Sequence, residues 1–189
     1  MIPIAGWFRQ HGAHHDIVHW AEPFGEDWRA AWESCSRGDW LLAWACRAGV
    51  EPLSILRATA AVAALALPHV PLGEGRPAAA VEAARLRAEG ALAPGELSRA
   101  ADAADAAAEQ APDAAAAVAA TAAAHAARTL ENLELAAACA ANVAEAAVLD
   151  AGECAMMAAL SFAHGQCAEA VRLAIPFETL EGAAQGQAI

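Results

Sequence analysis

Alanine dominates the middle of this chain, and this feature constrains the fold more than any other. Between Pro77 and Leu149 the sequence is mostly alanine, as in AADAADAAAEQAPDAAAAVAATAAAHAARTL from Ala100 to Leu130. Alanine enters a helix at the lowest free-energy cost, because it loses no side-chain freedom and competes for no backbone hydrogen bond. Its short side chain also lets helix axes approach more closely than the usual ~8–10 Å. The sequence therefore predicts an all-α fold, a single compact bundle of closely packed, alanine-rich helices.

Glycine and proline indicate where these helices begin and end. Runs of alternating β-branched or aromatic residues are missing from the sequence, so no sheet is expected. Asp39 is expected to cap the helix that starts at Trp40, and Gly165 to weaken the last helix, which Pro176 ends. The segment 113–149 is either one helix or two joined near 130–132. The remaining expected helices are 7–11, 13–21, 26–35, 40–48, 52–67, 77–89, 94–110 and 153–175.

The chain length of 189 residues fits one domain. We expect a single all-α domain over 1–178, with short tryptophan-rich helices in 1–50, longer alanine-rich helices in 51–178, and a flexible tail at 179–189. All six tryptophans lie before residue 45. Their bulk is expected to fill the wider gaps where the short helices cross the ends of the alanine bundle.

Charge and hydropathy exclude several classes of partner. The net charge is −12, so a phosphate backbone would be repelled and nucleic-acid binding is not expected. A basic protein would be attracted instead. Neither a membrane span nor a signal peptide is recognisable in the sequence, and the odd number of scattered cysteines (five) suggests buried, reduced thiols. These features predict a cytoplasmic protein.

A histidine group near the N-terminus is the strongest candidate for a reactive site. It consists of His11, His14, His15 and His19, with Asp16 and Glu22 nearby. On a helix over 13–21, His15 and His19 would lie one turn apart and could chelate a metal. The spacing fixes no third ligand, and Gly12 separates His11 from the helix. Surface or capping histidines are the preferred interpretation, and no metal or other cofactor is predicted.

Two further groups have a structural and a functional interpretation. Cys139, Cys154 and Cys167 could form a thiol cluster with His164, but their spacing matches no ligand motif and indicates core packing. Asp102, Asp105 and Glu109 form an acidic stripe on one helix, either a solvated face or a patch that meets a basic partner. Without an acid to orient a Cys–His pair and without an oxyanion cradle, no catalytic residue is predicted.

Three stretches resemble a bacterial protein family. They are AWESCSRGDWLLAWACRAGV (31–50), ALPHVPLGEGRPAAAVEAARLRAEG (66–90) and QCAEAVRLAIPF (166–177). In this order, around an alanine-rich middle, they look like immunity proteins of bacterial polymorphic-toxin systems, in the all-helical, immunity-protein-five-like branch. That family is expected to have an acidic residue before the Arg-Pro that opens a helix, as in E-D-R-P, whereas here Gly75 precedes Arg76. Glu74 is left to cap or salt-bridge locally.

The resemblance implies a non-enzymatic protein that neutralises a cognate toxin by direct binding, with Asp102, Asp105 and Glu109 as the candidate contact residues. Its expected partner is a toxin domain with a basic surface. Two alternatives stay open: a metal- or cofactor-binding helical protein that uses His15 and His19, and a scaffold that oligomerises through exposed alanine ridges. The oligomeric state is not predicted from the sequence.

Overall fold

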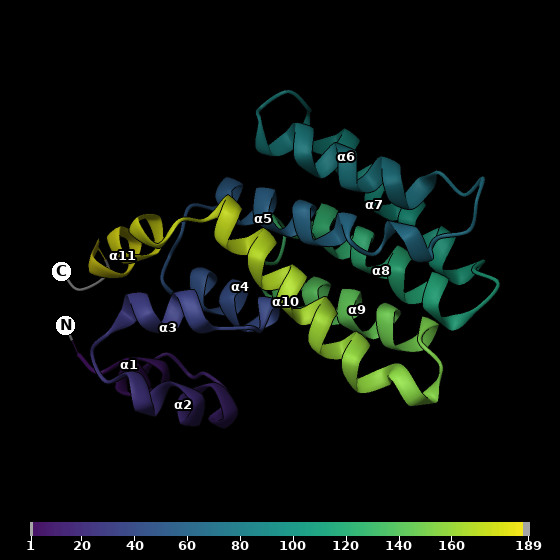
Figure 1. Cartoon of the computed structure of the whole chain (residues 1–189). Helices are drawn as coiled ribbons and strands as arrows, with labels where there is room; N and C mark the ends of the chain where they lie inside the picture. The colour runs from purple at the N-terminus through teal and green to yellow at the C-terminus, as the bar shows by residue number, and fades with distance from the viewer. Residues whose placement is uncertain (1, 187–189) are drawn as a thin grey trace. The chain divides into compact units, whose positions relative to one another are not determined.

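The computed structural model describes residues 2–186, and in this range the chain is built from helices and turns alone (Figure 1). The all-α prediction is confirmed, since none of the described residues belongs to a strand. No helix in this range is long and apolar enough to cross a lipid bilayer. The chain divides into two compact units, Met1–Cys35 and Ser36–Ile189. The boundary differs from the expected division at residue 50, because the helix that carries Trp40 and Trp44 belongs to the second unit.

The first unit is a small aromatic cluster on short helices. Trp7 and Trp28 meet edge to face, with ring centroids 5.3 Å apart, and Phe8 is fully buried beside them. The indole N–H of Trp28 donates to the carbonyl oxygen of Ile2 at 3.1 Å, so this buried polar group is satisfied. The elements of this unit are α1 (Ile4–Gln10), α2 (His15–Ala21), the 3-10 helix η1 (Glu22–Phe24) and α3 (Trp28–Ser34).

The second unit contains the alanine-rich helices. Consecutive helices from α5 to α10 pack against each other, and α5 also packs against α8, α9 and α10. Helix α4 lies against α9 and α10. Short connections favour such packing between sequence neighbours. The elements are α4 (Gly38–Arg47), α5 (Pro52–Ala64), η2 (Leu67–His69), α6 (Arg76–Ala88), α7 (Pro94–Glu109), α8 (Ala114–Arg128), α9 (Glu134–Asp150), η3 (Glu153–Ala155), α10 (Met156–Ala174) and α11 (Phe177–Gly186).

Helix α8 shows what the alanine composition achieves. It packs against α5, α6, α7 and α9. Every position of α8 that is buried carries alanine: 116, 119, 120, 122, 123, 124, 126 and 127. The side chain of Asp113 caps its first turn by accepting from the Ala116 amide at 2.8 Å. Methyl groups line the buried contacts of α8, which allows the neighbouring helices to pack close around it.

The segment 113–149 forms two helices, as one of the two alternatives expected. The carboxamide oxygen of Asn132 accepts from the Glu134 amide at 3.0 Å, next to the start of α9. Gly165 leaves α10 unbroken, because the rest of the helix supplies enough packing to offset the cost of one glycine.

Asp39 does not cap α4. The helix begins one residue earlier, at Gly38, and Asp39 lies in its first turn. Its carboxylate accepts from Arg37 Nε at 2.8 Å and from Arg37 Nη2 at 2.6 Å. This charge-assisted pair is stronger than a capping bond to a backbone amide, which explains the difference.

The expected flexible tail at 179–189 is helical as far as Gly186, and 187–189 lie outside the described residues. Pro176 precedes α11, where a proline costs no hydrogen bond. Phe177 and Leu180 lie three residues apart and are both buried. Their shared apolar face explains why the chain continues as a helix.

Candidate partner-binding surface

The acidic stripe lies on α7, as the sequence predicts, but α8 neutralises part of it. Arg128, in the last turn of α8, donates through Nη2 to Asp102 at 2.7 Å and through Nη1 to Asp105. The Asp102 side chain is 69% exposed and that of Asp105 42%. Glu109 is exposed and has no ion pair within the described range. The three carboxylates therefore share a surface, and Glu109 is the one most available to a partner.

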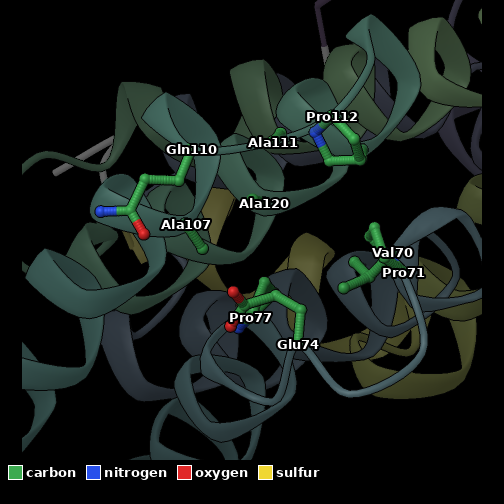
Figure 2. Close-up of a pocket in the computed structure, with 10 residues that line it drawn as sticks. Val70, Pro71, Glu74, Pro77, Ala107, Gln110, Ala111, Pro112 and Ala120 are labelled. Atoms are coloured by element: carbon green, nitrogen blue, oxygen red, sulfur yellow. The ribbon is translucent and has the colours of Figure 1, made fainter.

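A small recess opens at the end of α7, beside Gln110. It has a volume of about 160 Å³ and is walled mainly by proline, alanine and valine (Figure 2). An engineered cavity of about 150 Å³ is large enough for benzene. The recess therefore has room for one small apolar side chain. The lining residues are Val70, Pro71, Glu74, Pro77, Ala107, Gln110, Ala111, Pro112, Ala116 and Ala120.

A network of charged and amide groups holds one edge of this recess. Arg76 donates to Glu74 from its backbone N–H at 3.0 Å, from Nε at 2.8 Å and from Nη2 at 2.5 Å. The same Nη2 donates to the side-chain oxygen of Gln110 at 3.0 Å, which ties the loop before α6 to the end of α7. The Arg76 hydrogen bonds lower the pKa of Glu74 from 4.5 to about 2, so its carboxylate is ionised at neutral pH.

The ion pair between Arg76 and Glu74 fits the expectation that Glu74 pairs locally. Gly75 provides no acidic side chain directly before Arg76. Glu74, one residue earlier, forms the salt bridge with Arg76 instead. Sequence reasoning anticipated the local role of Glu74 but not the recess. The recess is built from three separate parts of the chain, and only the prolines at 71, 77 and 112 hinted at it.

The histidine group contains a capping residue, as the preferred interpretation expects, and it does not form the His15–His19 pair considered as an alternative. His19 Nδ1 lies 3.1 Å from Glu22 Oε2, whereas His15 Nε2 lies 2.9 Å from Asp16 Oδ1. His14 Nδ1 lies 3.3 Å from the other oxygen of Asp16. One potential donor atom from each of His14, His15 and Asp16 falls within 4.8 Å of the others. The cluster that forms therefore includes His14 and Asp16 in place of His19.

Two of the three cysteines expected in the core are buried there, and the third is not. Cys139 and Cys167 are fully buried, whereas Cys154 is exposed at η3. Burial raises the pKa of the Cys167 thiol to about 12, with Asp39 contributing, and it raises the pKa of Cys139 as well. Both thiols are therefore protonated at neutral pH and are poor nucleophiles.

Asp39 and His164 form a contact that the sequence did not reveal. His164 Nδ1 on α10 lies 3.8 Å from Asp39 Oδ1 on α4, and both side chains are largely buried. Burial, with Arg37 nearby, lowers the pKa of His164. The two residues are far apart in the sequence, and no spacing rule links them.

The surface of α7 thus carries exposed carboxylates, and an apolar recess lies at the C-terminal end of this helix. No protein-family model, curated protein or solved structure matches this chain.

Proposed function

We propose that this protein is a non-enzymatic immunity protein that neutralises a cognate bacterial toxin by binding it directly in the cytoplasm. The observation that carries the proposal is the set of exposed carboxylates on α7, where Glu109 has no ion pair within the described range. The resemblance of 31–50, 66–90 and 166–177 to toxin-immunity proteins supports it. The partner is a toxin domain that presents a basic surface.

Charge and shape would have separate roles in such a complex. A protein with a net charge of −12 attracts a basic partner over long range, which increases the rate of association. An apolar side chain that enters the recess would slow dissociation, because buried anchors dominate binding energy. Glu109 would act mainly on the first step, and the recess on the second.

Association kinetics with the cognate toxin test the electrostatic step. The partner is obtained by co-purification from the native host, and a toxin gene immediately upstream would identify it independently. The association rate constant is expected to fall at least about tenfold between roughly 50 and 500 mM salt. A rate that does not change with salt would contradict the electrostatic part of the proposal.

Matched variants test whether the toxin contact lies on α7. Glu109→Arg is expected to slow association several-fold, whereas Glu145→Arg, an exposed change of the same charge on α9, should have a smaller effect. Ala111→Leu, which narrows the recess, should increase the dissociation rate, and Ala141→Leu on the exposed side of α9 serves as its control. Equal effects within each pair of variants would show that the binding face does not lie on α7.

A further inference from the structure

A group of three potential metal ligands lies on the surface of the first unit. The side chains of His14, His15 and Asp16 are 70%, 82% and 60% exposed. Their donor atoms lie within 4.8 Å of one another, with His14 Nδ1 at 3.3 Å and His15 Nε2 at 2.9 Å from the Asp16 carboxylate. We infer that these three side chains bind one divalent transition-metal ion, with zinc as the reference case.

The local backbone holds the three residues in place. Gly12 adopts a positive φ of +65°, which turns the chain between α1 and α2. Ile17, Val18 and Ala21 of α2 are buried, so the helix is anchored on its inner side and the ligands face solvent. His14 also caps α2, since its Nδ1 accepts from the Asp16 amide at 3.4 Å. The bond is long, and a metal ion can replace it as the partner of that nitrogen.

The donor set selects the kind of metal. Two imidazole nitrogens and one carboxylate oxygen suit zinc, nickel or copper, whereas calcium and magnesium prefer oxygen ligands alone. Three protein ligands leave further coordination positions to water. The Asp16 carboxylate lies within 3.3 Å of a nitrogen of each imidazole ring, and the cation would take the position between the three donors. The site lies in the first unit and is independent of the proposed toxin contact on α7.

Isothermal titration of the full-length chain without a purification tag tests the site, with zinc chloride as the probe. One ion per chain is expected to bind, and binding should weaken as the pH falls, because protons compete for the imidazole nitrogens. Asp16→Asn and His14→Asn should each reduce zinc affinity at least about tenfold. Asparagine is a good helix-capping residue, so His14→Asn removes the imidazole while keeping α2 capped.

His19→Ala is the matched control, because His19 is an exposed histidine of the same helix that pairs with Glu22. This variant should bind zinc as the wild type does. Circular dichroism of each variant checks that the helices are retained. Absence of saturable binding by the wild type would overturn the proposal. Equal weakening by His14→Asn and His19→Ala would also overturn it, because it would indicate unspecific binding to surface histidines.

Discussion

At the scale of single residues, Gly38 shows how closely two helices meet in the second unit. A Cβ atom at this position would lie 2.4 Å from Cβ of Cys167 and 2.8 Å from the backbone carbon of the same residue. Real side-chain atoms do not pack at such distances. The first turn of α4 therefore rests directly on α10, and only glycine allows that contact.

Gly38→Ala is expected to reduce the free energy of unfolding by about 1–3 kcal/mol, because the added methyl group must push α4 away from α10. Gly165→Ala on α10 is the control, since a Cβ there meets nothing within 4 Å. That change should stabilise the protein by up to about 1 kcal/mol, because alanine favours the helix. Urea denaturation measures both variants. A neutral Gly38→Ala would mean that the contact is looser than described.

Glu74 makes stability depend on pH in a defined direction. Its pKa is about 2 in the folded protein against an ordinary value of 4.5, so folding favours the ionised carboxylate. The stabilisation is complete above about pH 4.5 and is lost as the pH falls toward 2. Glu74→Gln should therefore lose stability at pH 6 but show a smaller further loss on acidification than the wild type. Denaturation at pH 6 and pH 3 compares the two, and parallel losses would contradict the role of Glu74.

The sequence predicts which residues share a helix face, but it does not predict which side chains pair between helices. The acidic residues on α7 follow from helical spacing alone, so Asp102, Asp105 and Glu109 share a face as predicted. Their pairing with Arg128 depends on how α8 packs against α7, which local spacing does not determine. The same holds for Asp39 and His164, which only the packing of α4 on α10 brings together.

At the scale of helices, α8 depends on its small side chains. Ala123 is fully buried in the middle of the helix, and α8 has neighbours on several sides. Larger side chains have no space to enter there. The alanine content is thus a packing requirement as well as a helix preference.

Ala123→Leu is expected to destabilise the second unit by about 1–3 kcal/mol, because the larger side chain must displace a packed helix. Ala141→Leu, at an exposed position of α9, should change the free energy of unfolding by less than about 0.5 kcal/mol. Thermal unfolding followed by circular dichroism measures both. Similar melting temperatures for the two variants would show that α8 is not tightly enclosed.

Helix positions were the most predictable part of the fold. Proline and glycine are strong local signals, so the ends of α5, α6 and α7 fall within a few residues of expectation. The prediction of a flexible tail fails over 179–186. It treats Pro176 only as the end of a helix, although proline also fits the start of one. The burial of Phe177 and Leu180 depends on tertiary packing, which the sequence pattern alone left unspecified.

At the scale of the whole molecule, the chain separates into an aromatic unit and an alanine-rich unit. The contacts that join α4 to α10 lie inside Ser36–Ile189. This unit holds its own core, including the fully buried Trp44, Leu56 and Val171. A core of its own is the feature that lets a part of a chain fold alone.

A chain that starts at Ser36 is therefore expected to keep a strongly helical circular dichroism spectrum and to unfold in one cooperative step. The full-length protein is the control, measured at the same concentration. Loss of the cooperative transition in the shorter chain would show that its core requires the first unit.

The uneven exposure of the cysteines has a practical consequence. Cys154 is exposed at η3, while Cys139 and Cys167 are fully enclosed and Cys46 is largely covered. A maleimide dye should therefore attach first to the turn between α9 and α10 of the native protein, without mutagenesis. The natural sequence thus offers a ready attachment point for fluorescence measurements of complex formation.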